Sequence, residues 1–226
     1  MKLLQALLLC WLAVSSSVHA NIPDKAGDVN QQVQQPAADI KTLLNQLPKS
    51  SYDDKAVTLK NIAALNDEKS LLLLTSLLDG DLFYVKKTKL VVYREKQENK
   101  RYLATDAITG EDVGEFKKRK LKKIGINNSL RGTLNGLIAE LQISSPDISL
   151  REKAALELLK KIDATLLVVV NKALITEEDD HIRSILNTAK SIHGLKADTS
   201  EARLVAIAEL DGSLYPETRI ALNQFI

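Results

Sequence analysis

Residues 82–131 read LFYVKKTKLVVYREKQENKRYLATDAITGEDVGEFKKRKLKKIGINNSLR, and this stretch does not follow the helical pattern of its flanks. It contains three strand-like runs separated by polar turns, Leu90–Tyr93, Arg101–Ala104 and Val113–Phe116. Gly110, in the second turn, can adopt a positive φ. These runs predict a small antiparallel β-meander of three or four strands. We expect the meander and a basic connector after it to occupy residues 82–125.

Residues 39–81, before this insert, carry apolar side chains at helical spacing and predict a first helical repeat block. Asp53 or Asp54 can cap the second helix of the block. The third helix is predicted over Leu71–Leu78 and is closed by Asp79-Gly80. The last two helices are expected to form an antiparallel hairpin.

Residues 126–226 repeat this design as a second helical repeat block. Near its predicted helix starts a unit recurs: an acidic or small polar residue, an apolar or small one, an arginine, and then an Ala-rich apolar face. The arginines of these units are Arg151, Arg183, Arg203 and Arg219. Short helical units of this kind cannot bury their apolar faces alone and must stack. We assign the β-branched run Val168–Val170 to a helix, because it lies between two helical signals. The predicted fold class is mainly α, a HEAT-like solenoid of helical hairpins with a β-meander insert.

The first 20 residues have the features of a secretory signal peptide. Lys2 is followed by the apolar run Leu3–Val14 and by Val18-His19-Ala20, a small-residue cleavage signal. The apolar run is too short to span a bilayer, although an uncleaved N-terminal anchor is the alternative. We expect residues 21–38 to be a disordered leader. The final helix stops at Ile226 without a cap, so the second block is expected to be cut off within a repeat.

Overall charge is nearly balanced, with 31 Lys and Arg against 29 Asp and Glu. This balance argues against nucleic acid as a dedicated partner. Cys10 is the chain's one cysteine and lies inside the predicted signal peptide. The mature chain would then contain no thiol and form no disulfide.

Four groups of short sequence pieces follow one another along the chain. They are Leu77-Leu78-Asp79-Gly80 with Leu82 and Tyr84, Thr105-Asp106-Ala107 with Thr109-Gly110, Leu121-Lys122-Lys123-Ile124 with Asn127-Asn128 and Leu130-Arg131, and Ser145-Pro146-Asp147 leading into Leu150-Arg151 and Ala154-Ala155. In this order they resemble the N-terminal extracytoplasmic region of urea-type ABC transporter permeases, a branch of the branched-chain amino-acid permeases. The resemblance covers roughly residues 40 to 226.

This resemblance implies a non-catalytic domain exported to the periplasmic side of the inner membrane, tethered there if the permease follows. The implied partners are the transporter's membrane subunits and the periplasmic solute-binding protein, and no cofactor is implied. Family members continue into a multi-helix permease, where the urea pathway would lie, so no substrate residue is transferred to this chain. The alternative is a free-standing periplasmic HEAT-like interaction module.

The densest block of positive charge is a candidate interaction surface made of Lys117, Lys118, Arg119, Lys120, Lys122 and Lys123. It could face anionic lipid headgroups. It could instead dock an acidic surface of the solute-binding protein. The simplest alternative is a solvated connector whose charges keep an exposed segment soluble.

The residues that carry the resemblance are expected to have structural rather than ligand-binding roles. Asn127-Asn128 offers an N-cap for a helix from about Ser129 to Leu141. Arg131 lies in the first turn of that helix, where the dipole disfavours a cation, so an ion pair with Asp79 or Asp106 is predicted. The complete set of these residues is Asp79, Gly80, Thr105, Asp106, Gly110, Ile124, Asn127, Asn128 and Arg131.

Enzyme chemistry has little support in the sequence, and we predict that the chain is not an enzyme. The chain contains no nucleophile elbow, phosphate-binding glycine loop or HExxH motif. His181 and His193 remain after the signal peptide, and His181 beside Asp179-Asp180 could form at best a weak metal site. A solvent-facing His181 is the favoured interpretation, and Glu177–Asp180 is interpreted as a polar turn before a helix. A hydrolase with an unrecognised site is the third hypothesis.

Overall fold

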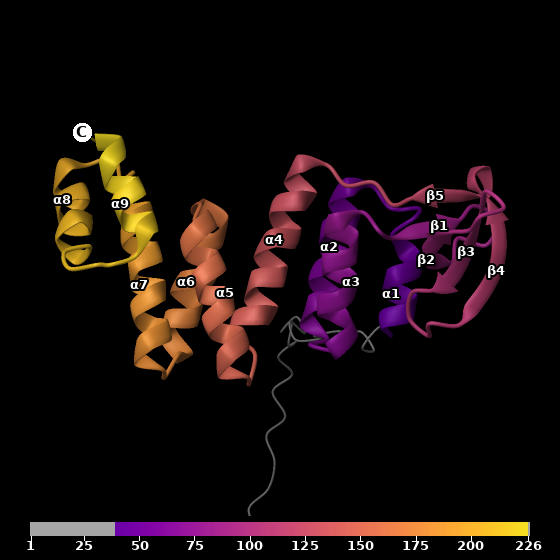
Figure 1. Cartoon of the computed structure of the whole chain (residues 1–226), viewed down its shortest axis with the longest axis horizontal. Helices are drawn as coiled ribbons and strands as arrows, with labels where there is room; N and C mark the ends of the chain where they lie inside the picture. Colours follow the sequence, from indigo (N-terminus) through magenta and orange to yellow (C-terminus); the bar gives the residue numbers. More distant parts are fainter. Residues whose placement is uncertain (1–38, 226) are drawn as a thin grey trace, which may run out of the picture. The chain divides into compact units, whose positions relative to one another are not determined.

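The computed structural model describes residues 39–225, so the predicted signal peptide and leader lie outside the described residues. Within that range the chain forms nine α-helices and one five-stranded antiparallel sheet (Figure 1). The sheet lies between the third and fourth helices in the sequence. This confirms the prediction of a mainly helical protein with a small antiparallel sheet.

Three helices precede the sheet: α1 (Ile40–Gln46), α2 (Tyr52–Ala64) and α3 (Glu68–Asp79). The predicted aspartate cap of α2 was wrong, because Ser51 occupies that position. The Ser51 hydroxyl accepts a hydrogen bond from the backbone N–H of Asp54 at 3.1 Å and donates one to the Asp54 carboxylate at 2.7 Å. Asp53 and Asp54 lie in the first turn instead, where negative charge also favours the helix.

The sheet contains β1 (Phe83–Val85), β2 (Val91–Lys96), β3 (Arg101–Asp106), β4 (Asp112–Lys117) and β5 (Leu121–Lys123) in the order β4-β3-β2-β1-β5. The 3₁₀ turn η1 (Lys118–Lys120) joins β4 to β5. Strands β2, β3 and β4 correspond to the three predicted runs, whereas β1 and β5 were not predicted. The segment expected to be a basic connector therefore includes an edge strand, with Lys122 paired to Tyr84 of β1.

The two faces of the sheet contribute to different apolar clusters. Tyr84 and Val91 pack into the core shared with α1–α4. The opposite face forms a small cluster of its own from Phe83, Val85, Val92, Ala104 and Leu121. A three-residue 3₁₀ turn spans roughly 10 Å at most, about half of the ~19 Å between the edges of a flat five-stranded sheet. The sheet must therefore curl around this cluster, which explains why the cluster is buried without a covering helix.

Six helices follow the sheet: α4 (Asn128–Ile143), α5 (Ile148–Lys161), α6 (Ala164–Thr176), α7 (Asp180–Gly194), α8 (Ser200–Glu209) and α9 (Pro216–Leu222), with the 3₁₀ turn η2 (Asn223–Phe225) after them. The run Val168–Val170 lies within α6. Five of these helices, α4 to α8, begin at a side-chain cap that accepts a backbone N–H, and the caps are Asn127, Asp147, Asp163, Asp179 and Thr199.

Helix α4 connects the two halves of the helical structure. It packs against α2 and α3 and also against α5 and α6. Its residues Leu130, Leu134 and Ile138 belong to the core shared with the sheet, whereas Ile143 belongs to a second core built from α5–α8. Beyond α4, helix α7 packs against α5, α6, α8 and α9 (Figure 1). The helices therefore add to the structure in sequence order.

Candidate interaction surface

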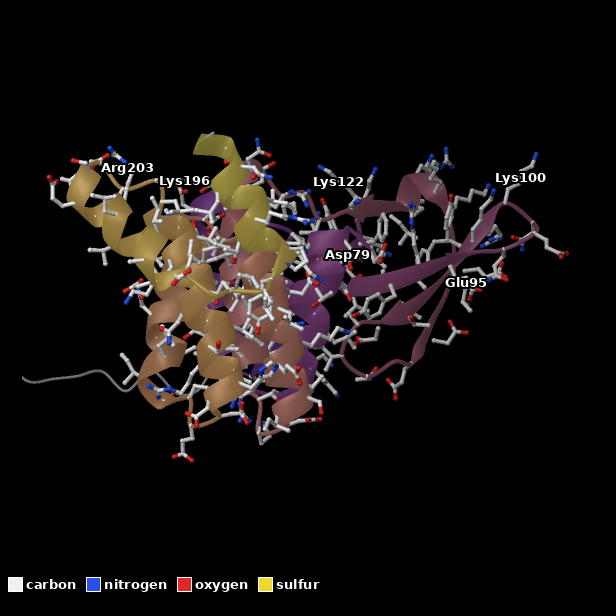
Figure 2. The ribbon with its side chains drawn as sticks, turned by 60° about the vertical axis from the view of Figure 1, so that its left-hand side comes forward. Asp79, Glu95, Lys100, Lys122, Lys196 and Arg203 are labelled. Carbon is white, nitrogen blue, oxygen red and sulfur yellow. The ribbon has the colours of Figure 1, made fainter. Side chains whose placement is uncertain are left out.

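The predicted basic residues lie where strand β4 ends and strand β5 forms a free edge of the sheet. Lys117 is the last residue of β4, Lys118–Lys120 form η1, and Lys122 and Lys123 belong to β5. All six side chains are exposed, and Figure 2 shows Lys122 at this end of the sheet. A short, lysine-bearing edge strand also discourages pairing with another chain.

The turn between β1 and β2 adds further cations to this surface. The backbone N–H of Lys86 donates a hydrogen bond to the carbonyl of Lys120 at 2.9 Å, and Val85 is paired with Leu121. These contacts place the exposed Lys86 and Lys87 beside η1. We call the combined surface the lysine edge, which consists of Lys86, Lys87, Lys117, Lys118, Arg119, Lys120 and Lys122.

Sequence reasoning missed the contribution of Lys86 and Lys87. The run Lys86-Lys87-Thr88-Lys89 is visible in the sequence, but about 30 residues separate it from the basic block. Only the pairing of β1 with β5 brings the two segments together. If Phe83–Val85 had been predicted to be a strand, its pairing with the basic block could have been considered and Lys86 and Lys87 included in the surface.

Positive charge is concentrated in the sheet. Residues 82–125 contain thirteen Lys and Arg against six Asp and Glu, a formal charge of +7. Residues 39–81 carry five Lys and Arg against seven Asp and Glu, a formal charge of −2. Residues 126–226 carry eleven against fourteen, a formal charge of −3.

The pKa of Lys55, in helix α2, is lowered by burial and lowered further by repulsion from the nearby Lys122.

Lys123 has a structural position at the end of helix α3. A Cβ on Gly80 would overlap the end of the Lys123 side chain. Gly80 has a φ of 84°, and its N–H and that of Asp81 both donate to the carbonyl of Ser76. A cation at this helix C-terminus is favoured by the helix dipole. Lys123 therefore belongs to the closure of α3, and we leave it out of the lysine edge.

The turn after β3 is built around Asp106. Its buried carboxylate accepts hydrogen bonds from the backbone N–H groups of Ile108 at 2.7 Å and Thr109 at 3.0 Å. Gly110, with a φ of 72°, donates its N–H to the carbonyl of Asp106 at 2.9 Å. Thr105 lies in β3 opposite Tyr93. These residues shape the turn and leave the Asp106 carboxylate little capacity for a distant partner.

The start of helix α4 is held by Asn127 and Ile124. The Asn127 side chain accepts the N–H of Leu130 at 2.8 Å, so Asn127 is the N-cap and Asn128 is the first helical residue. Ile124 is buried and donates its N–H to the carbonyl of Leu82 at 3.0 Å. These contacts connect the sheet to α4.

The predicted ion pair of Arg131 was wrong. Among the described residues Arg131 forms no ion pair, and its side chain is exposed. Asp79 is also exposed, while Asp106 serves its own turn. Water solvates an exposed guanidinium well enough that the helix dipole alone does not require a protein partner.

Three arginines share one geometry in the second helical block. Each is the fourth residue of its helix, and its guanidinium donates to the backbone carbonyl six residues earlier, in the preceding turn. These hydrogen bonds run from Arg151 to Ser145 at 3.0 Å, from Arg183 to Glu177 at 2.9 Å and from Arg203 to Ala197 at 2.7 Å. Figure 2 shows Arg203 near Lys196 at the turn between α7 and α8. The arginines thus fasten each helix start to the turn before it.

Glu177 lies in the turn before α7 and binds Arg151, which is attached to the turn before α5. From the sequence Glu177 was interpreted only as part of a polar turn, so this role was not predicted. Its carboxylate is 3% exposed and accepts hydrogen bonds from Arg151 at 2.9 and 3.2 Å and from the N–H of Asp179 at 3.0 Å. Burial alone would raise the pKa of Glu177, but these hydrogen bonds together lower it below its ordinary value. The same carboxylate raises the pKa of Arg151. The carboxylate is therefore held ionised.

Histidine chemistry has no organised site in the described residues. His181 is exposed, with its Nε2 atom 3.3 Å from Glu152 Oε1. Between residues 39 and 225 there is no group of three His, Cys, Asp or Glu side chains that could hold a metal ion.

A hollow of about 540 Å³ is lined by residues at the starts of α3 and α5 and the end of α4, among them Asp67, Leu71, Leu141, Leu150 and Lys153.

None of the described helices is both long enough and apolar enough to span a bilayer. In comparisons with known proteins, no family model, no curated protein and no solved structure matches the chain.

Proposed function

We propose that this chain is a non-catalytic scaffold on the periplasmic side of the inner membrane, the extracytoplasmic domain of a urea-type ABC permease. In this proposal it helps to assemble the transporter or docks the solute-binding protein. The transporter assignment rests on the resemblance of the ordered sequence pieces between residues 40 and 226. The scaffold assignment rests on the packing described above.

The arginine geometry supports a HEAT-like stacking of helical hairpins. Arg151, Arg183 and Arg203 make the same type of contact at the starts of α5, α7 and α8. Helices that repeat one closing contact and pack on their sequence neighbours have the organisation of a helical repeat array. Such arrays present extended surfaces to protein partners, which suits a docking role.

One observation carries the proposal: four of the residues that give the resemblance lie at junctions of the fold. Gly80 closes α3, Asp106 and Gly110 form the turn after β3, and Asn127 caps α4. Side chains at these positions specify how elements connect and do not converge on one cavity. A sequence pattern of this kind is expected for a shared scaffold rather than for a shared catalytic centre.

The test is direct binding to purified transporter parts. The chain, carrying a C-terminal affinity tag, is mixed with the periplasmic urea-binding protein of the same organism and, separately, with the detergent-solubilised membrane subunits. We expect saturable binding to at least one of them, measured by calorimetry or by co-elution. An unrelated periplasmic solute-binding protein of similar size and charge serves as the control.

Absence of binding to every transporter component would contradict the transporter assignment. If the chain then captured other envelope proteins, the free-standing periplasmic interaction module would replace it. The substitution Arg203→Met removes one of the repeated arginine contacts, at a helix far from the sheet. Measuring the binding of this variant tests whether binding depends on the helical array.

A further inference from the structure

The lysine edge is an exposed cationic surface without carboxylates of its own. Its seven cations come from two turns and the strand ends beside them, and the backbone hydrogen bond from Lys86 to Lys120 joins the two turns. Residues 86–94 and 116–123, which form these turns and their flanks, contain no Asp or Glu. Within residues 39–225 none of the seven forms an ion pair. Their charge is therefore available to an external partner.

The composition of this surface favours lipid headgroups over a protein partner. Six of the seven residues are lysines and only Arg119 is an arginine. Lysine is depleted in protein–protein interfaces, which depend on buried aromatic and arginine anchors. Two aromatic side chains of the sheet are not free to anchor a protein partner, since Phe83 is buried and Tyr102 lies under the guanidinium of Arg94. Flexible lysines instead suit a diffuse anionic surface, near which each one tightens binding by about fivefold.

The distribution of charge gives this binding a direction. The sheet segment, residues 82–125, carries +7, while the helical segments on both sides carry −2 and −3. A negatively charged bilayer attracts the first and repels the other two. The screening length at physiological salt is about 8 Å, so the cations closest to the bilayer dominate the attraction.

We propose that the lysine edge binds the anionic phospholipid headgroups of a membrane surface, with the sheet toward the bilayer and the helices away from it. This binding goes beyond the proposed function, because it requires no transporter subunit. It needs only a fixed cluster of exposed cations and an anionic surface. Loss of membrane binding and loss of binding to transporter components are therefore separate outcomes, and each tests one of the two proposals.

The experiment measures co-sedimentation of the full chain with vesicles of phosphatidylcholine and phosphatidylglycerol in a ratio of roughly 2:1. Vesicles of phosphatidylcholine alone report any charge-independent binding, including that of the apolar run at residues 3–14. The test variant replaces Lys86, Lys87, Lys118 and Lys120 with Ser. At about fivefold for each of the four lysines, we expect it to bind the anionic vesicles roughly several hundredfold more weakly than the parent chain.

The matched control replaces four exposed lysines of the helices, Lys60, Lys153, Lys190 and Lys196, with Ser. It has the same net charge as the test variant, and we expect its binding to stay within about twofold of the parent, because screening limits distant charges. Replacing the four lysine-edge residues with Arg keeps the charge and should keep the binding. Equal losses in the test and control variants, or equal binding of the parent to neutral and anionic vesicles, would overturn the proposal.

Discussion

At the scale of single residues, Glu177 is a buried charge with a fixed role. It accepts both hydrogen bonds of a fork from Arg151 and one from its own turn. Arg151 also donates to the carbonyl of Ser145. One pair of side chains therefore joins the turn before α5 to the turn before α7. Breaking such a pair from one side leaves an uncompensated charge.

Replacing Glu177 with Gln should lower the free energy of unfolding by about 2 kcal/mol, because the guanidinium of Arg151 loses its counter-charge. Urea unfolding followed by circular dichroism measures the change. Glu178, the exposed neighbour, supplies the control: Glu178→Gln should change the free energy by less than about 0.5 kcal/mol. Similar losses in the two variants would contradict the assigned role of Glu177.

The same pair predicts a pH dependence. The folded state lowers the pKa of Glu177, so its stabilising contribution is complete above the unfolded pKa of about 4.3 and is lost as the pH falls through the folded pKa. The stability difference between the parent and Glu177→Gln should therefore be largest at neutral pH and shrink toward about pH 3. Glu157, whose pKa is lowered by hydrogen bonds from Lys161 and Lys160, titrates in both proteins and cancels. A difference that grew in acid would exclude this explanation.

Gly80 tests the closure of α3. Its φ of 84° disfavours any side chain, and a Cβ there would overlap Lys123. Gly80→Ala should destabilise the fold by about 1–2 kcal/mol. Gly132→Ala is the matched control in α4, where a Cβ meets no neighbouring atom, and it should stabilise by about 0.5–1 kcal/mol. Thermal unfolding of both variants shows whether the two changes have opposite signs. Adding Lys123→Ala to Gly80→Ala should recover only the part due to overlap.

At the scale of elements, the local signals placed the helices well and the short strands poorly. Helices α2 to α8 each begin next to a Ser, Thr, Asn or Asp cap and carry an apolar face, which are features of a few neighbouring residues. Strands β1 and β5 have three residues each. Three residues carry no usable alternation, so their pairing comes from the fold and not from a local pattern.

The arginine at the fourth helical position offers a comparison between elements. The Arg203 guanidinium donates to the carbonyls of Ala197 and Asp198, whereas the guanidinium of Arg131, at the same position in α4, makes no hydrogen bond in the described residues. Arg203→Met keeps the apolar stem and should cost about 1–2 kcal/mol of unfolding free energy. Arg131→Met should change it by less than about 0.5 kcal/mol. Chemical denaturation of the pair decides between a specific contact and a general preference for arginine.

At the scale of the whole molecule, two apolar cores share helix α4. Leu74 lies fully buried in the core next to the sheet, and Leu186 lies fully buried in the core of the later helices. Arrays whose parts touch mainly their neighbours transmit destabilisation over short range. The stability of the two cores should therefore be partly separable.

Leu186→Ala should cost about 2–5 kcal/mol and increase amide hydrogen exchange mainly in α5–α9. Leu74→Ala is the reciprocal variant and should increase exchange mainly in α1–α3 and the sheet. Exchange mass spectrometry resolves the two regions. If either variant loosened both regions equally, the fold would be one cooperative unit rather than two coupled cores.

Sequence patterns alone predicted the helical class, the position of the sheet between two helical blocks, and several junction residues such as Asn127 and Gly80. Periodicity, capping and positive φ depend on adjacent residues, so they can be read without a fold. The basic block was also visible, and it supplies most of the lysine edge.

Contacts between residues far apart in the sequence became visible in the folded chain and not before. Lys86 joins Lys120 across the β1–β5 pairing, and Arg151 reaches Glu177 across 26 residues. Arg131, by contrast, forms no ion pair with Asp79, Asp106 or any other residue between 39 and 225. The physical reason is the same in each case: an ion pair or a charged surface depends on distances through space, and stacking of helices and pairing of strands set those distances. Local sequence constrains the conformation of a segment but not the neighbour it acquires.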